Sequence, residues 1–114
     1  MKCRIFKHTF ELSDLNSNTN RLTIPLNGLR LVRWLDAKPH PTSAHKIDVW
    51  FVVVDGIDLS VEDKRDPVLQ VEGTGWLFQP TSKMSYITTV RTAADYVWHL
   101  FGIEPGLGFE EGFR

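Results

Sequence analysis

The chain has 114 residues, 42% of them hydrophobic, a formal net charge of −1 and one cysteine. A single domain of this length buries a core without needing a disulfide or a metal, and this composition excludes wholesale disorder. The near-neutral charge argues against long nucleic acids and acidic membranes as partners.

Two further features of the sequence indicate the cellular compartment of the protein. A lone Cys3 forms no internal disulfide, which favours a reducing environment. The opening MKCRIFKHTFEL lacks the apolar core of a secretory signal, and no apolar run reaches the ~20 residues of a membrane helix. We therefore expect a cytoplasmic protein.

Alternating apolar and polar residues open the chain. Residues 2–12 predict a half-buried strand, followed by a polar turn cluster at 13–20. Residues 22–26 predict a short extended piece at a sheet edge, because Pro25 cannot donate a ladder hydrogen bond. The dipeptide Asn27-Gly28 predicts a two-residue hairpin turn.

The hairpin turn leads into a predicted strand at 29–35, with Leu29, Leu31 and Leu35 on one face and Val32 and Trp34 on the other.

Residues 37–45 predict a loop, because two prolines in three residues disfavour regular structure. The most apolar stretch follows at 47–54, IDVWFVVV, and predicts a central strand covered on both faces. Asp55-Gly56 then turns the chain into a charged, irregular segment at 57–66.

The C-terminal half predicts further strands. One spans about 68–78 and is interrupted by glycines at 73 and 75, and another spans 86–90 after a turn at 79–82. Residues 92–95 fit either one helical turn or a hairpin connection, and 96–101 fit either a strand or a helix end. The strand gives the cleaner apolar row and is preferred.

Together these segments predict an all-β domain at residues 1–102, a small six- to seven-stranded antiparallel sandwich or barrel with at most one short helix. Residues 103–114 predict a glycine-rich C-terminal tail.

Three short motifs carry a family likeness. Gly73-Thr74-Gly75-Trp76, the strand from Tyr86 to Val90, and Val97-Trp98-His99-Leu100-Phe101 resemble the GTG-aromatic, Y-x-x-T and V-W-H-x-F motifs of small uncharacterised β-rich proteins from bacteriophages and their bacterial hosts. Thr88 stands where that family tends to have glycine. The resemblance implies a phage-type accessory protein and brings no catalytic residues with it.

Candidate binding residues fall in two groups. The first comprises Gly73, Thr74, Gly75, Trp76, Trp98 and His99. Exposed amide groups around the glycines offer an anion cradle, with a strand bulge as the alternative reading. The glycines do not match a dinucleotide fingerprint. For His99, a donor or base role competes with a half-buried histidine bonded to backbone.

The second group is the basic-aromatic cluster Arg30, Arg33 and Trp34, near Lys38. Arginine and tryptophan are common anchors at protein interfaces, and solvent-facing charges on a strand are the alternative. His8, His40 and His45, with acids at 55 and 58, match no metal-ligand spacing. We therefore expect no metal, no cofactor and no catalytic residue.

The sequence thus favours a binding protein over an enzyme. Four tryptophans and seven phenylalanines exceed the needs of a small core, so some are expected at an interface. The expected role is to counter a host defence or regulatory system by capturing a host protein or a small anionic, nucleotide-like signal, in the cytoplasm of the infected or host bacterium. The alternative is a virion component of the tail or head decoration. A homo-oligomer is compatible with either role.

Overall fold

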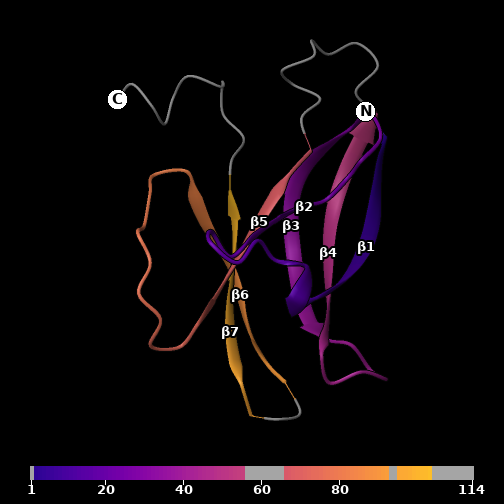
Figure 1. The fold of residues 1–114 in the computed structure, drawn as a ribbon. Helices are drawn as coiled ribbons and strands as arrows, with labels where there is room; N and C mark the ends of the chain where they lie inside the picture. Colours follow the sequence, from indigo (N-terminus) through magenta and orange to yellow (C-terminus); the bar gives the residue numbers. More distant parts are fainter. Residues whose placement is uncertain (1, 56–65, 93–94, 104–114) are drawn as a thin grey trace.

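The computed structural model describes residues 2–55, 66–92 and 95–103 (Figure 1). In chain order the elements are β1 (Cys3–Glu11), the 3-10 turn η1 (Leu12–Asp14), β2 (Arg21–Thr23), β3 (Leu29–Pro39), β4 (Lys46–Asp55), β5 (Val68–Gly73), β6 (Met84–Arg91) and β7 (Val97–Ile103). The strand pairs are all antiparallel, and the described residues contain no α-helix. The all-β prediction is confirmed.

Two sheets face each other as in a sandwich (Figure 1). The strand order is β1-β4-β3 in the three-stranded sheet and β2-β5-β7-β6 in the four-stranded sheet. Their inner faces bury a common core that includes Phe10, Phe51, Leu69, Val71 and Leu100. Within the described ranges, no helix has the length and apolarity to span a membrane.

The strand at the heart of the predicted fold is β4, and it is central in its sheet. Its inner row, alternating from Ile47 to Val53, is at most 1% exposed. Its outer row is covered less evenly: Asp48 and Val54 are buried, whereas Trp50 is partly exposed. Cover on both faces is therefore confirmed only in part.

The turn at Asn27-Gly28 exists, but the hairpin predicted from it is wrong. Both residues have positive φ, 54° and 91°, and the N–H of Leu29 donates to the carbonyl of Leu26 at 3.2 Å. The strands on either side belong to different sheets, since β2 pairs with β5 and β3 pairs with β4. The segment between β2 and β3 crosses from one sheet to the other, and its Ile24 and Leu26 side chains are buried in the core.

Two irregularities in β3 overturn its predicted face pattern. The register shifts between Leu31 and Arg33 and again between Trp34 and Asp36. Each shift inserts one extra residue, which leaves Val32 and Leu35 at the surface and turns Trp34 inward. Simple alternation therefore fails after the first bulge.

The predicted loop at 37–45 is shorter than expected, because β3 continues to Pro39. An edge strand tolerates a proline, since an N–H that faces outward has no ladder partner to lose. This position places His40 beside the end of β4, where its N–H donates to the carbonyl of Lys46 at 3.0 Å.

The inward-facing Trp34 closes the core between the sheets. Its ring meets Phe51 edge-on at a centroid distance of 5.6 Å. It also covers Gly102 on β7 so closely that a Cβ built at that glycine would overlap the indole. Contact between a large side chain and bare backbone thus sets the spacing of the two layers here.

The C-terminal strands are confirmed as strands but differ from prediction in their bounds, since β6 begins earlier, at Met84, and β7 runs on to Ile103, the first residue of the predicted tail. β5 ends at Gly73, so the predicted continuation to residue 78 is wrong. Strand is confirmed for β7. β6 and β7 form a hairpin, at whose connection the N–H of Thr92 donates to the carbonyl of Tyr96 at 2.9 Å, while residues 93–94 lie outside the described residues. Residues 57–65 of the predicted irregular segment at 57–66, and residues 104–114 of the predicted tail at 103–114, lie outside the described residues.

Candidate functional site

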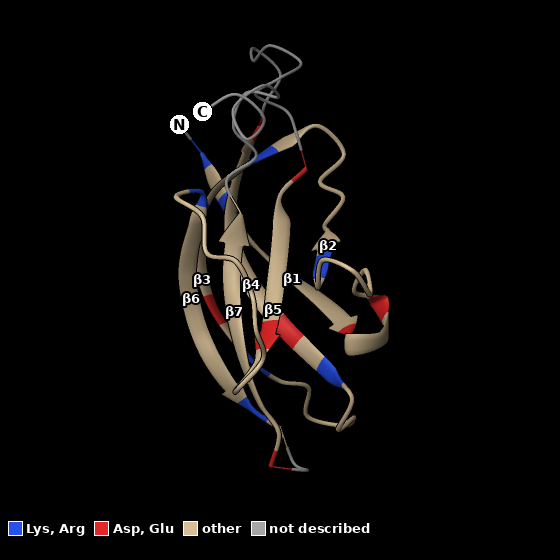
Figure 2. Cartoon of the chain, turned by 60° about the vertical axis from the view of Figure 1, so that its left-hand side comes forward, with Lys and Arg blue, Asp and Glu red and all other residues tan. Residues whose placement is uncertain are grey.

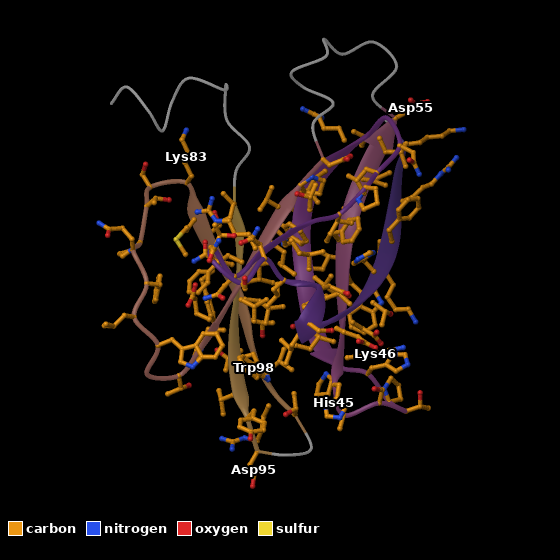
Figure 3. All side chains as sticks on the ribbon, viewed as in Figure 1. His45, Lys46, Asp55, Lys83, Asp95 and Trp98 are labelled. Atoms are coloured by element: carbon orange, nitrogen blue, oxygen red, sulfur yellow. The ribbon has the colours of Figure 1, made fainter. Side chains whose placement is uncertain are left out.

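A ten-residue connection, residues 74–83, runs along the outer side of the four-stranded sheet, and we call it the strap (Figure 1). β5 and β6 flank β7 and both run antiparallel to it. Gly73 pairs with Trp98 near the start of β7, whereas Met84 pairs with Ile103 at its end. The strap must therefore travel the length of β7, and Lys83 and Trp98 lie toward its opposite ends (Figure 3).

The GTG motif makes the turn that starts the strap. The N–H of Trp76 donates to the carbonyl of Gly73 at 3.0 Å, and Gly75 at the third position has φ +87°, as in a type II turn. The N–H of Thr74 donates to the carbonyl of Val97 at 3.4 Å. The motif is thus a turn and not a strand bulge, and two of its amide groups already have acceptors inside the chain.

Gly73 is small for a packing reason. A Cβ at this position would lie 2.7 Å from Cε2 of Trp76. The Trp76 ring lies over the glycine and meets Trp98 edge-on at 5.4 Å, and Trp98 in turn contacts Tyr96 at 6.0 Å. The first half of the strap is therefore anchored by three neighbouring aromatic rings.

A second aromatic group anchors the strap farther along. Phe78 lies 5.8 Å from Phe101 on β7, and Phe101 lies 5.9 Å from Tyr86 on β6. Between the two anchors, Leu77 is 100% exposed. The strap thus presents an apolar side chain to solvent from a backbone that is held on both sides.

Large side chains of the strap and of the strands beside it are exposed, and we call them together the strap face. They form two groups, because Trp98, the neighbour of Trp76 and Tyr96, packs against the core, whereas Phe101, the neighbour of Phe78 and Tyr86, alternates to the outer face with His99. Five of its members are exposed beyond a third of their area: Trp76 48%, Leu77 100%, Phe78 42%, Tyr86 61% and Tyr96 64%. Grouped exposure of this kind marks interaction surfaces, because a monomer gains nothing by leaving clustered aromatics in water.

His99 ties the strap to the sheet through side-chain hydroxyls. Its Nε2 lies 2.8 Å from Oγ1 of Thr74, and its Nδ1 lies 3.0 Å from Oγ1 of Thr89. Thr89 Oγ1 also lies 2.6 Å from the hydroxyl of Tyr86. A neutral imidazole donates from one nitrogen and accepts at the other, so both ring positions are used within this network. Its partners are hydroxyls and not the backbone groups of the alternative reading.

Polar side chains of β5 lie buried on the same outer face. Glu72, 2% exposed, pairs with His99 across the sheet and accepts from Nε2 of Gln70 at 2.7 Å. Nδ2 of Asn20 lies 3.3 and 3.4 Å from its two oxygens, and Nε of Arg21 donates to Oε1 of Gln70 at 2.8 Å. This row links β2 to β5 by side-chain hydrogen bonds.

The structure separates the residues proposed from sequence. One set gathers at the start of the strap: Gly73, Thr74, Gly75, Trp76, Trp98 and His99. Arg30 and Arg33 instead pair with Val54 and Val52 on the outer face of the other sheet, and Trp34 lies between the sheets. The basic-aromatic cluster is therefore not one site.

Comparison with known proteins places the chain in a family. A family model described as a domain of unknown function, DUF7352, matches residues 1–106. The chain belongs to the DUF7352 family. No curated protein and no solved structure matches it.

Away from the strap, this DUF7352 domain holds a buried carboxylate on the outer face of the three-stranded sheet. Oδ1 of Asp48 accepts from Thr9 at 2.6 Å and lies 2.9 Å from Nδ1 of His40. Burial alone would raise the pKa of Asp48, but the hydrogen bonds from Thr9 and His40, with the charges of His40 and Lys7, hold that pKa below its ordinary value. The cluster favours a charged Asp48 and fastens β1, β4 and the chain after β3.

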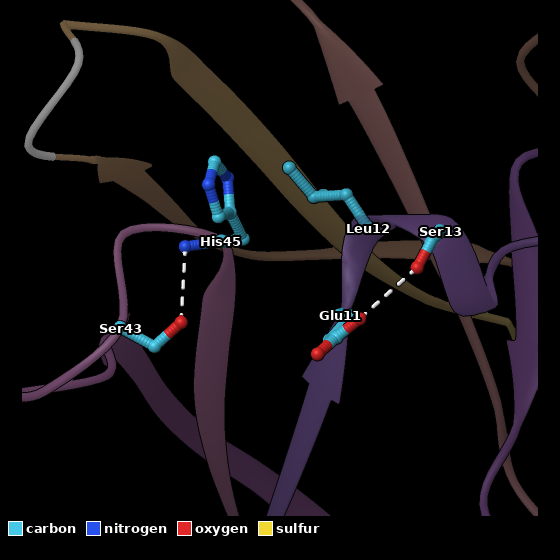
Figure 4. Close-up of a pocket in the computed structure, with 5 residues that line it drawn as sticks. All are labelled: Glu11, Leu12, Ser13, Ser43 and His45. Carbon is cyan, nitrogen blue, oxygen red and sulfur yellow. Dashed lines mark hydrogen bonds between the residues drawn. The ribbon is translucent and has the colours of Figure 1, made fainter.

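A shallow pocket of about 310 Å³ opens near the ends of β1 and β4 (Figure 4). Its polar groups bond within their own loops: Ser13 Oγ donates to Glu11 at 3.2 Å, and the N–H of His45 donates to Ser43 Oγ at 3.4 Å. Leu12 forms its apolar side. Glu11 also approaches Nζ of Lys46 at 3.9 Å. These pairings account for the hydroxyl and carboxylate groups of the lining.

Sequence reasoning missed the polar row of Gln70 and Glu72 and the exposed Leu77. The signal for the row was present, since polar residues alternate with Leu69 and Val71. Alternation normally assigns such residues to solvent, and only the strap and the β2–β5 pairing explain their burial. Leu77 fell inside a predicted strand, which hid its exposure.

Proposed function

We propose that this DUF7352 domain is a binding protein that captures a partner protein through the strap face. The observation that carries the proposal is the grouped exposure of Trp76, Leu77, Phe78, Tyr86 and Tyr96 around an anchored connection. Aromatic and large aliphatic anchors of this kind dominate the energy of protein interfaces.

Anchoring strengthens the case for binding. Leu77 extends from a backbone that Trp76 and Phe78 hold against β7, so little conformational freedom is lost when a partner covers it. Burying a fully exposed leucine contributes about 2 kcal/mol, which corresponds to roughly a 30-fold change in affinity. One side chain at this position can therefore decide whether a complex forms.

The biological setting of the proposal rests on the motif resemblance. The motifs from Gly73 to Trp76 and from Val97 to Phe101 supply the strap turn and its platform strand. If the resemblance to phage and host proteins reflects a shared role, the partner is a host protein of a defence or regulatory system. The complex would then form in the bacterial cytoplasm.

The test compares three purified proteins as baits in bacterial extract: the native chain, Leu77→Ser and Val32→Ser. Val32 is the matched control, because it is also apolar and 45% exposed but lies on β3 of the other sheet. We expect at least one protein that the native chain and Val32→Ser retain and that Leu77→Ser loses. Far-UV circular dichroism checks that both variants are folded.

Retention of the same proteins by all three baits would overturn the proposal. Two companion measurements identify the competing roles. A thermal shift with nucleotides that Leu77→Ser abolishes would replace the partner protein with a small anionic signal. Sedimentation showing assembly of the native chain into large particles, reversed by Leu77→Ser, would favour the virion component, in which a second copy covers the strap face.

A further inference from the structure

The outer edge of β1 is an open position for another strand. β1 stands at the end of its sheet and pairs with β4 without a register shift over nine residue pairs, from Cys3 with Val54 to Glu11 with Lys46. Among the described residues, no strand pairs with its other side. Its outer backbone groups therefore form a regular ladder with no partner strand among the described residues, and only at its end does the N–H of Glu11 donate to Oδ2 of Asp14 at 2.9 Å.

The other three edges are blunted. β3 carries two register shifts and ends in a proline, and β6 carries one register shift. β2 is only three residues long. Bulges, prolines, short length and charged side chains are features by which sheets discourage edge pairing. β1 has only the last of these, in Arg4 and Lys7, which repel a basic strand and attract an acidic one, and its Ile5 is 65% exposed.

Charge indicates what kind of strand fits. β1 and the residue before it carry Lys2, Arg4 and Lys7 against one acid, Glu11 (Figure 2). Arg33 and Lys38 of β3 are exposed on the outer face of the same sheet. Opposite charges on directly paired residues stabilise a sheet, and like charges destabilise it. The edge therefore favours an acidic strand.

A second copy of this chain offers no register that places an acid opposite Lys7 along the whole of β1. Two β1 strands that pair antiparallel about a two-fold axis must place side chains of the same sheet face opposite each other. Each allowed register is therefore centred on one residue that faces its own copy. Centring the pair on Lys7 opposes two lysines, and centring it on Phe6 gives Lys7 the apolar Ile5 as its partner. Centring it on Thr9 opposes Glu11 to Lys7 but pairs only residues 7–11.

We propose that the edge of β1 accepts an extended acidic segment of a partner protein as a fourth, antiparallel strand of the three-stranded sheet. The backbone ladder supplies the affinity and the basic side chains select the sequence. This surface is on the other sheet from the strap face, so the proposal stands apart from the function proposed above.

The probe is a fluorescein-labelled peptide, Thr-Val-Thr-Thr-Glu-Val-Val-Glu-Thr, paired antiparallel so that its glutamates lie opposite Lys7 and Arg4. The control peptide has lysine in place of both glutamates. We expect fluorescence anisotropy to show binding of the acidic peptide only, weakening as salt is raised. Lys7→Glu should weaken binding by about fivefold, because an attraction becomes a repulsion. Lys38 lies on β3 at the other edge of the same sheet, so Lys38→Glu should change the peptide affinity little.

Hydrogen exchange locates the peptide. We expect slower exchange of the β1 amides when the acidic peptide is added, with the strap unaffected. Absence of binding, equal binding of both peptides, equal loss with Lys7→Glu and Lys38→Glu, or protection elsewhere would each overturn the proposal. A dimer in sedimentation whose β1 amides are protected without peptide would overturn it in favour of a second copy. None of these results alters the Leu77→Ser comparison.

Discussion

Replacing either of two glycines with alanine gives the most decisive test of how the strap and the core differ. Gly73 and Gly102 both lie under a tryptophan ring, Trp76 and Trp34 respectively. In both cases the new methyl group collides with the indole, at 2.7 Å from Cε2 of Trp76 and with overlap of the Trp34 ring. The collisions look alike, but the rings differ in their freedom to move.

The expected costs follow from that freedom. Trp76 is 48% exposed on the strap, so its ring can swing into solvent and lose its edge-on contact with Trp98, worth about 0.5–1.5 kcal/mol. The alanine recovers about 0.4–1 kcal/mol by restricting the unfolded chain, which leaves Gly73→Ala within about 1 kcal/mol of the native protein. Trp34 is held against Phe51 inside the sandwich, so Gly102→Ala should cost about 2–3 kcal/mol, near the top of the range for overpacking.

Urea unfolding followed by circular dichroism measures both free energies, and tryptophan fluorescence of the folded Gly73→Ala protein should shift to the red as Trp76 becomes solvated. Trp76→Ala completes a double-mutant cycle. In the Trp76→Ala background, Gly73→Ala should leave the free energy of unfolding unchanged or raise it. Equal costs for the two glycines, or a larger cost at Gly73, would refute the view that the strap ring is movable and the core ring is not.

Four further outcomes follow from three residues, Asp48, His8 and Gly75. Asp48→Asn should lower the free energy of unfolding by about 2 kcal/mol, since charge-assisted hydrogen bonds from Thr9 and the neighbouring imidazole are weakened; urea titration measures it. Burial, opposed by a nearby carboxylate, lowers the pKa of His8, so the unfolded chain binds the proton first and stability should fall as the pH drops below 6.5. The depressed pKa of Asp48 adds stability that is complete above 3.8 and lost as the pH falls further. Unfolding curves from pH 8 to pH 5 test the loss of stability expected from His8, and the free energy of unfolding of His8→Gln should change less with pH. Gly75→Ala should cost about 1 kcal/mol in a thermal melt, because alanine at φ +87° is strained.

The strand content was readable from the sequence because most strands carry a strong local pattern. The stretch at 47–54 has apolar residues on both faces, and no helix of that length would favour so many β-branched side chains. The all-β class and the number of strands followed from it and from regularly spaced turns.

Pairing was not readable, because it depends on contacts distant in sequence. Asn27-Gly28 specifies a tight turn equally well within a sheet and between sheets, and the burial of Ile24 and Leu26 decides between them. The bulges of β3 are likewise fixed by Trp34, which must turn inward to cover Gly102 on a strand about seventy residues away in the printed sequence.

The part of the candidate site that lies within one contiguous motif could be predicted from the sequence. The contacts that form only when two strands pair could not. Gly73 to Trp76 were named together because they are contiguous, and they do form one turn. The bond between Thr74 and His99, and the burial of Glu72 beside it, depend on the β5–β7 register. Arg33 and Trp34 show the converse, since neighbours in sequence point to opposite sides of a strand.

The two proposed surfaces make different demands on a partner, and this decides how they can be used. The strap face offers side chains around Leu77 and suits a partner with an apolar hollow. The β1 edge offers backbone groups beside Lys7 and suits an extended segment. If separate partners use them, the losses from Leu77→Ser and Lys7→Glu should appear in different complexes and add independently. If one partner spans both sheets, each single change should weaken the same complex, and the double variant should lose the avidity that joint attachment provides.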